Sequence, residues 1–338
     1  MRGTGMKAVG ILGVGYAVPE RRLTNFDLEK MVDTSDEWIT TRTGIKERRI
    51  ADEGTAASDL AVLAGQRALE QAQVEPRDID LVIVATVTGD YVFPSTACLV
   101  QDRLGIPNAA AYDLAAGCSG FVYALDQAWH GVRSGAYRYA LVIGSEVLSR
   151  IVDWQDRSTC VLFGDGAGAV VLGPVPDGYG LMASYLGSDG SGADKLYVPA
   201  GGSRQPLTPE AMAGRQQFIR MCGKDVFKFA VRVIEEATLE VLRRAGLAPS
   251  DIDLFIPHQA NIRIIDAAVE RLGIDRERIV VNVDRYGNTS AASIPIALGE
   301  ALDAGRIQPG HRIVCVGFGA GLTWGAVAMR WGGRDVTA

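Results

Sequence analysis

The stretch RALEQAQVEPRDIDLVIVATVT, residues 67–88, has a counterpart in the second half of the chain, EVLRRAGLAPSDIDLFIPHQAN, residues 240–261. Each is typical of a helix, a proline-containing connection and a strand, and each contains DIDL. YRYALVIGSE (137–146) and GHRIVCVGFG (310–319) match at the same offset. Between these matches, YDLAAGCSGFVYALDQA (112–128) and NVDRYGNTSAASIPIALGEA (282–301) each indicate a strand, a turn of small residues and a helix. The sequence therefore predicts a duplicated α/β unit.

The strand segments are rich in valine and isoleucine, as in LVIVATV and RIVCVGF. Such runs indicate strands buried on both faces, as in sheets that helices cover. We expect an α/β fold of two duplicated halves, 1–173 and 217–338, with mixed sheets and helices in layers. The segment 174–216 is rich in Gly, Ser and Pro, which predicts a connecting and loop region over a site.

Composition restricts the function classes. The 338 residues are 48% hydrophobic and 22% charged, typical of a globular protein, and the net charge of −6 gives no general attraction for nucleic acid. The N-terminal segment is apolar only in short pieces, which argues against a signal peptide or a membrane span. Five cysteines without a CxxC pair argue against a zinc site or a disulfide framework and favour a cytoplasmic location. We expect no metal.

Cys118 stands out among these cysteines. It follows a strand directly and precedes the helix predicted from SGFVYALDQAWHGV, at the strand end where open α/β sheets bind ligands. The helix N-terminus is expected to lower the pKa of its thiol, and the flanking small residues to leave the sulfur accessible. Cys98, Cys160, Cys222 and Cys315 are expected to be small buried hydrophobic residues.

The second half contributes two further polar groups. Asn288 lies at the turn that corresponds to the Cys118 turn, and His258 follows the DIDLFIP strand directly. A thiol, an imidazole and an amide are therefore expected to meet at one locus, which predicts a catalytic site.

These motifs resemble the thiolase superfamily, most closely the β-ketoacyl-acyl-carrier-protein synthase III group. That group carries A-A-x-C-x-G-F, H-Q-A-N, G-N-T-S-A-A-S and a terminal G-F-G-G-G-x-T-W-G loop, which is GFGAGLTWG (317–325) here. The likeness covers almost the whole chain. It implies a thiolase-like fold and a homodimer.

The resemblance also implies a reaction, the decarboxylative Claisen condensation of a short acyl-coenzyme A with malonyl-acyl-carrier protein, which initiates fatty acid synthesis. Coenzyme A thioester and the phosphopantetheine arm are substrates, so no cofactor is implied. Cys118 would carry the acyl group, and His258 and Asn288 would stabilise the enolate. The backbone N–H groups of Cys118 and Ala320 would form the oxyanion hole, with Ala320 replacing the family's middle glycine.

Further positions follow from the same resemblance. Phe93 would cross a dimer interface to close the partner's acyl pocket, and Lys224 stands where the family has asparagine. The residues implied to bind coenzyme A or to line the tunnel are Trp38, Arg42, Thr43, Arg157, Met221, Gly223, Phe227, Asn261 and Phe318. The basic residues expected to attract the acidic carrier protein are Arg220, Lys224, Lys228 and Arg263.

Two alternatives use the same three residue types. A type III polyketide synthase or another starter-condensing enzyme of secondary metabolism shares the Cys–His–Asn set. A papain-like cysteine hydrolase also has Cys, His and Asn in this order, but the chain lacks a CGSCW-type stretch, and the duplication argues against that class.

Overall fold

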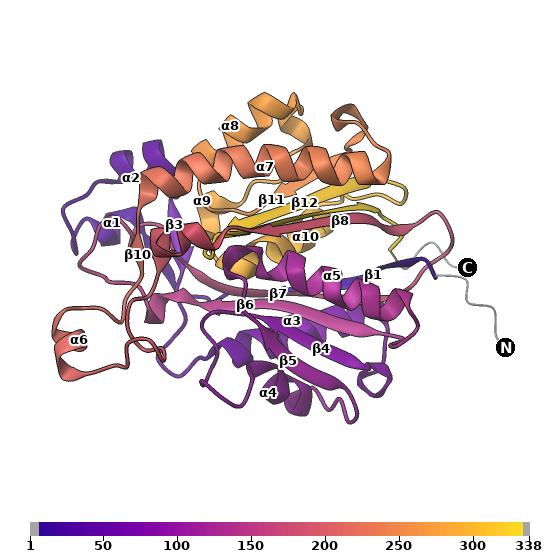
Figure 1. Ribbon diagram of the computed structural model, residues 1–338, viewed down its shortest axis with the longest axis horizontal. Coiled ribbons are helices and arrows are strands. Elements are labelled where there is room, and N and C mark those ends of the chain that lie inside the picture. The colour runs from indigo at the N-terminus through magenta and orange to yellow at the C-terminus, as the bar shows by residue number, and fades with distance from the viewer. Residues whose placement is uncertain (1–6, 334–338) are drawn as a thin grey trace.

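Two mixed β-sheets organise the chain, which the computed structural model describes over residues 7–333 (Figure 1). The first sheet has the order β1-β7-β6-β4-β5. Strands β5, β4 and β6 run parallel, whereas β7 is antiparallel to both β6 and β1. Its strands are β1 (Val9–Ala17), β4 (Leu81–Ala85), β5 (Ala110–Leu114), β6 (Ala140–Val147) and β7 (Asp165–Pro174).

The second sheet has the order β11-β12-β13-β8. Strands β11 and β12 are parallel, and β13 is antiparallel to both β12 and β8. Its strands are β8 (Gly180–Ser188), β11 (Leu254–Pro257), β12 (Arg312–Gly319) and β13 (Thr323–Arg330). Short pairs complete the set, formed by β2 (Arg22–Thr24) with β3 (Glu47–Arg49) and β9 (Leu196–Tyr197) with β10 (Arg220–Met221).

Helices cover both sheets in layers, as Figure 1 shows. α3 packs on the outer face of the first sheet and α7 on the outer face of the second, while α5 and α10 lie between the two sheets. These helices are α3 (Ala57–Ala72), α5 (Gly120–Arg133), α7 (Gly223–Ala245) and α10 (Ser293–Asp303). The others are α1 (Asn25–Leu28), α2 (Asp36–Thr43), α4 (Thr96–Arg103), α6 (Pro209–Ala213), α8 (Ile262–Leu272) and α9 (Val283–Tyr286).

The two halves repeat the same order of elements at the offset seen in the sequence. The offset between the starts of β4 and β11 is the same as that between the starts of α5 and α10. The 3₁₀ turns η2 (Gly117–Ser119) and η7 (Ser290–Ala292), which precede those two helices, keep that spacing. The counterpart of β5 is reduced to a single bridge between Phe255 and Ile279. The predicted α/β fold of two duplicated halves is therefore confirmed.

The segment 174–216 differs from a simple connection. It contains β8, which pairs along its length with β13 as β1 pairs with β7, so the second half begins at β8. The glycines and serines of GLMASYLGS interrupt its apolar residues, so this edge strand lacks the continuous apolar run of the buried strands.

A continuous apolar core runs through the middle layer and joins residues of both sheets. At its centre the backbones approach closely, because a Cβ added at Gly144 of β6 would lie 2.2 Å from the Ala291 carbonyl oxygen. Cys160 and Cys315 are buried as expected, but Cys98 and Cys222 are exposed, so the expectation of burial is wrong for these two. Over the described residues, no helix is long and apolar enough to cross a membrane.

Candidate active site

Cys118 occupies the turn η2, between the end of β5 and the start of α5. The turn requires a positive φ of 53° at Gly117, where a Cβ would lie 2.9 Å from the backbone nitrogen of Ala320. The Cys118 side chain is 7% exposed and lines two cavities. Glycine at this point therefore lets the loop of Ala320 approach the cysteine closely.

The environment of Cys118 raises its pKa, contrary to the effect expected from the helix N-terminus. Burial raises the pKa of the thiol to about 12, and the charge of Glu146 acts in the same direction. A hydrogen bond with the side chain of Ser290 opposes this rise. Desolvation dominates because the sulfur lies beneath the surface rather than at it. The resting residue is therefore a thiol, and its reaction requires a proton acceptor.

His258 follows β11 and is almost fully buried, at 1% exposure. Its Nδ1 lies 2.6 Å from the Ser293 hydroxyl, and its ring meets the edge of Phe318 with centroids 5.0 Å apart. Burial lowers the pKa of His258 to about 3, so the imidazole is neutral at pH 7.

Asn288 precedes η7 and is 8% exposed. Its Oδ1 accepts a hydrogen bond of 2.8 Å from the Ser290 backbone N–H, which directs Nδ2 to act as the donor. Its backbone bonds to the first half, because its N–H donates to Leu162 O at 2.8 Å and its carbonyl accepts from Gly164 N–H at 3.0 Å. The fold therefore holds this amide from both halves.

The three predicted catalytic side chains line one cavity of about 150 Å³. All five tunnel residues expected in the second half line the same cavity, namely Met221, Gly223, Phe227, Asn261 and Phe318. A second cavity of about 290 Å³ shares Cys118, Phe163 and Leu196 with the first and is almost entirely apolar. The thiol therefore lies between the cavity that His258 and Asn288 line and one that is almost entirely apolar.

The loop after β12 lies against the cysteine. A Cβ added at Gly319 would lie 2.6 Å from the Cys118 backbone nitrogen, and Ala320 lines the apolar cavity beside Cys118. Positive φ values at non-glycine residues of the described chain occur at Gln73, Arg215 and Ser290, so Ala320 keeps an ordinary φ. Alanine is therefore compatible with the backbone here.

Trp38 of α2 is flanked by two guanidinium groups. Arg42 and Arg157 each lie 5.4 Å from the centroid of its ring, in a cation–π arrangement. Arg42 also contacts the second half, because its carbonyl accepts from Asn261 Nδ2 at 3.1 Å. Thr43 differs from the expectation, because it is buried and its hydroxyl bonds to Ile39 O and Ile45 N within the chain.

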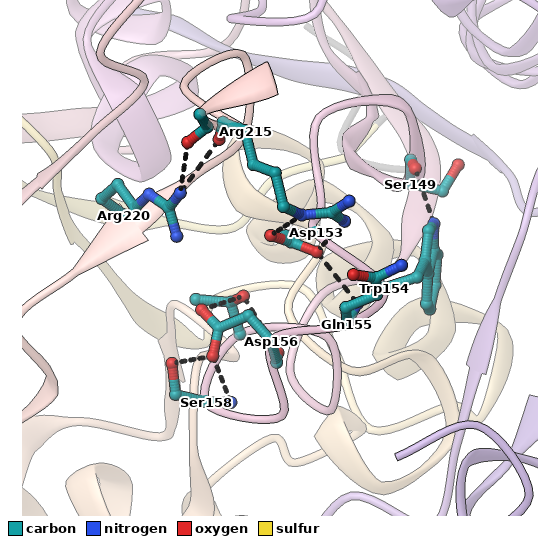
Figure 2. A network of polar contacts seen from close by, with 10 residues as sticks. Ser149, Asp153, Trp154, Gln155, Asp156, Ser158, Arg215 and Arg220 are labelled. Carbon is teal, nitrogen blue, oxygen red and sulfur yellow. Dashed lines mark hydrogen bonds and ion pairs between the residues drawn. The ribbon is translucent and has the colours of Figure 1, made fainter. Parts of the chain in front are cut away.

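The four expected basic residues divide into two groups. Lys224 and Lys228 are exposed one turn apart on α7, and Arg263 lies 5.8 Å above the ring of Phe227. Arg220 instead donates to the carbonyl of Arg215, whose own side chain pairs with Asp153 (Figure 2). The structure therefore brings three of the four toward one surface.

Phe93 is 84% exposed and lies outside both cavities of this chain. The preceding residues Tyr91 and Val92 are exposed as well. These three form an apolar loop on the surface of a single chain.

Sequence reasoning missed Ser290 and Ser293, which contact the predicted catalytic residues, and Glu146, which contacts Ser290. Ser290 and Ser293 belong to the GNTSAAS motif, and Glu146 ends the YRYALVIGSE match, but nothing in those motifs shows which side chains they contact. Ser290 joins Cys118, Asn288 and Glu146, and Ser293 fixes the His258 ring. The described residues contain no group of three or more side chains suited to hold a metal ion.

Comparison with known proteins agrees with this geometry. Residues 112–190 match the model for 3-oxoacyl-[acyl-carrier-protein (ACP)] synthase III, and residues 242–331 match the model for its C-terminal part. The chain is 60% identical over 324 residues to beta-ketoacyl-[acyl-carrier-protein] synthase III of Caldanaerobacter subterraneus subsp. tengcongensis, covering 96% of this chain and 98% of that protein.

Solved structures give the same result. Synthase III of Thermus thermophilus superposes with a TM-score of 0.89 at 54% identity, covering 96% of this chain and 99% of that one. The priming β-ketosynthase of the R1128 polyketide biosynthetic pathway superposes with a TM-score of 0.91 at 37% identity, covering 99% of both chains. With its duplicated fold and its buried Cys–His–Asn cavity, the chain belongs to the 3-oxoacyl-[acyl-carrier-protein] synthase III family.

Proposed function

We propose that the protein condenses a short acyl-coenzyme A with malonyl-acyl-carrier protein to a β-ketoacyl-acyl-carrier protein, through an acyl-Cys118 intermediate. The observation that carries the proposal is the convergence of Cys118, His258 and Asn288 on one buried cavity. The names of the relatives support this reaction. It is the initiating condensation of fatty acid synthesis.

In the first step, the sulfur of Cys118 attacks the thioester carbonyl and coenzyme A leaves. The backbone N–H groups of Cys118 and Ala320 stabilise the oxyanion, which is supported by the close approach of Gly319 to the cysteine. The acyl chain enters the apolar cavity, whose 290 Å³ is at the small end of ligand pockets and favours a short primer.

In the second step, the malonyl group loses carbon dioxide and leaves an enolate. The Ser293 hydroxyl lies 2.6 Å from His258 Nδ1 and accepts from the Gln259 N–H at 3.4 Å. In this mechanism the hydroxyl donates its proton to Nδ1, so the ring proton is on Nε2. His258 Nε2–H and Asn288 Nδ2–H then stabilise the enolate oxygen. A neutral imidazole suits this role, because it donates without losing its proton.

The residues at the mouth of the catalytic cavity suit two substrates that bind in succession and carry the same phosphopantetheine arm. Trp38, Arg42 and Arg157 offer a ring and two positive charges to the nucleotide of coenzyme A. Lys224, Lys228 and Arg263 offer positive charge to an acidic carrier protein. Because both substrates bring their own reactive thioester, the reaction needs no separate cofactor.

We further propose a homodimer in the cytoplasm. The exposed apolar loop of Tyr91, Val92 and Phe93 suits an interface with a second copy, where Phe93 would close the partner's acyl cavity. All five cysteines are free, which suits a reducing compartment.

A starter-condensing role in polyketide synthesis is a second candidate. It is favoured by the likeness to the R1128 priming ketosynthase over 99% of the chain. The two roles share the chemistry and differ in the primer.

Intact-protein mass after incubation with a panel of acyl-coenzyme A esters tests the proposal. One acyl adduct is expected on the wild type and none on Cys118→Ala, and the preferred ester identifies the primer. Equal labelling of the alanine variant, or no labelling of either protein, would refute the acyl-Cys118 intermediate.

A further inference from the structure

Glu146, near the end of β6, is a fully buried carboxyl group at the centre of the molecule. Its Oε2 accepts from the hydroxyls of Thr86 and Thr88 at 3.2 and 2.5 Å and from the Val87 N–H at 3.1 Å. Its Oε1 accepts from the Ser290 hydroxyl at 3.0 Å. Hydroxyls and one backbone N–H therefore surround this carboxyl group, and no cation within residues 7–333 forms an ion pair with it.

Ser290 links this carboxyl to the nucleophile. It has a φ of 48°, a left-handed conformation that glycine would adopt without strain. A serine here costs on the order of 1 kcal/mol in backbone strain, and its side chain makes the contacts that glycine could not. The hydroxyl donates to Glu146 at 3.0 Å, its interaction with the Cys118 thiol lowers the pKa of that thiol, and Ser290 and Cys118 line the same cavity.

The pleat of β6 determines which charged groups face Glu146. Gly144 faces η7, so Glu146, two residues on, lies on that same side. α3 packs on the opposite face, and Asp165 of β7, which pairs with Val147, also points there. On the Glu146 side, β4 and η7 contribute no ionisable side chain, and η2 contributes Cys118.

The remaining charged groups on that side belong to two helices. On α5, Asp126 and His130 pair with each other along the helix, and Arg133 lies over the ring of Trp129. On α10, Glu300 is bound by Arg285 and Tyr286, and Asp303 accepts from the Tyr16 hydroxyl. Cys118 is the group on this side whose pKa the charge of Glu146 raises.

We propose that Ser290 and Glu146 form a proton relay that deprotonates Cys118 during acyl-enzyme formation, a step that rests on the proposed function. The Cys118 S–H bond breaks as its proton moves to Ser290 Oγ, and the original Ser290 proton forms an O–H bond at Glu146 Oε1. The sulfur attacks the thioester carbon, and the bond to the coenzyme A sulfur breaks. Glu146 then returns its proton through Ser290 to the departing coenzyme A thiolate, which leaves as the thiol, and Glu146 is ionised again.

The alternative acceptor in the cavity is less suited to this step. His258 has its Nδ1 occupied by Ser293, and burial lowers its pKa to about 3, which makes it a weak base. Burial raises the pKa of Glu146 to about 7, between that of an ordinary carboxyl and that of the buried thiol. A base with a pKa near the working pH is the one that transfers protons efficiently. In this relay Ser290 touches the reacting sulfur, and Glu146 is a positioning residue that acts through it.

Separate measurements of the two half-reactions test the relay. Acylation of Cys118 is followed by rapid quenching of acetyl-coenzyme A reactions and intact-protein mass, and decarboxylation by carbon dioxide release from malonyl-acyl-carrier protein. Glu146→Gln and Ser290→Ala are each expected to slow acylation by on the order of 10²-fold. Decarboxylation should change by less than about threefold, because Ser290→Ala keeps the N–H that holds Asn288.

The pH profile of acylation supplies a readout that a purely structural role would not move. In the wild type the rate rises with pH and levels off above about 7, once Glu146 is ionised. In Glu146→Gln the rate should continue to rise tenfold per pH unit, because hydroxide alone then removes the proton. Wild-type acylation rates in both variants, or equal losses in both half-reactions, would overturn the relay.

The chain contains a matched control. Asp165 and Ser149 form a second buried serine–carboxylate pair, with Ser149 Oγ 2.6 Å from Asp165 Oδ2, on the other face of the sheet and away from the cysteine. Asp165→Asn should leave acylation within about threefold of the wild type, and a loss as large as that of Glu146→Gln would overturn the relay. If Glu146→Gln does not fold, Ser290→Ala decides alone. A wild type that is never acylated at Cys118 would instead refute the proposed function.

Discussion

The turns η2 and η7 have the same place in their halves and different chemistry. Each follows the strand region of its half and leads directly into a middle-layer helix, and the two are separated by the offset of the repeat. The first presents Cys118, and the second presents Ser290, with Asn288 just before it in the chain. The duplicated fold therefore supplies two equivalent backbone positions at one cavity, and the proposed nucleophile and the proposed hydrogen-bond donors lie in opposite halves.

The largest expected effect separates these two tasks. Cys118→Ala should reduce condensation by on the order of 10⁶-fold, the scale for loss of a catalytic nucleophile, yet retain decarboxylation of malonyl-acyl-carrier protein. Asn288→Ala should retain acylation and slow decarboxylation by on the order of 10²–10³-fold. Parallel assays of acyl adduct and carbon dioxide release check this. Loss of both half-reactions in either variant would contradict the division.

The two halves should also respond to pH in opposite directions. His258 has a folded pKa of about 3, below its ordinary 6.5, so its contribution to stability is complete above pH 6.5 and falls by up to about 5 kcal/mol toward pH 3. Glu146 has a folded pKa of about 7, above its ordinary 4.5, so its contribution is complete below pH 4.5 and falls by up to about 3 kcal/mol as pH rises through 7.

Urea unfolding across this pH range checks both signs. His258→Gln should remove the loss on the acid side, and Glu146→Gln the loss between pH 4.5 and 7. Unchanged pH profiles in the two variants would show that other groups control stability.

The next largest effect is expected on stability, where the backbones of the two halves approach closely at Gly144. Gly144→Ala should destabilise the protein by about 3 kcal/mol, because its Cβ would meet the backbone oxygen of Ala291. Gly54→Ala is the control, since nothing lies within 4 Å of its Cβ, and it should change stability by less than about 0.5 kcal/mol. The free energy of unfolding measures both, and similar values would show that the contact can relax.

The smallest effect is expected at the contact between Asn261 and Arg42, which joins the two halves without involving Cys118, His258 or Asn288. Asn261 is the N-cap of α8 and donates to Arg42 O, so Asn261→Ala should cost about 1 kcal/mol in stability and raise the KM for acyl-coenzyme A several-fold with little change in kcat. Asn261→Asp keeps the cap acceptor and loses the donor. A KM near that of the wild type for this variant would show that the cap of α8, and not the contact with Arg42, determines the KM for acyl-coenzyme A.

Much of this arrangement could be predicted from the sequence, because the constant offset of the repeat fixes which turns are equivalent. The layers, the order of elements and the meeting of Cys118, His258 and Asn288 follow from it. The strand β8 could not be predicted, since its glycines and serines interrupt the apolar run that marks the other strands.

The electrostatics of the site also could not be predicted. Burial decides the pKa of Cys118, and burial is a property of the assembled core rather than of the residues next to it in the chain. Glu146 and Ser290 belong to different halves of the chain, so no local pattern indicates their contact. Thr43 shows the converse, because the hydroxyl implied to hold coenzyme A is consumed by the end of its own helix.

The backbone bonds that hold Asn288 between Leu162 and Gly164 have a consequence for dividing the chain. A cut at the exposed turn of Asp177 and Gly178 would leave each sheet in one piece, with its strands and their order intact. Neither fragment would hold the amide in position, because Asn288 lies on one and its backbone partners on the other. Decarboxylation by a mixture of the fragments would therefore report their reassembly, and the molecule could serve as a split enzyme whose signal depends on the joining of its halves.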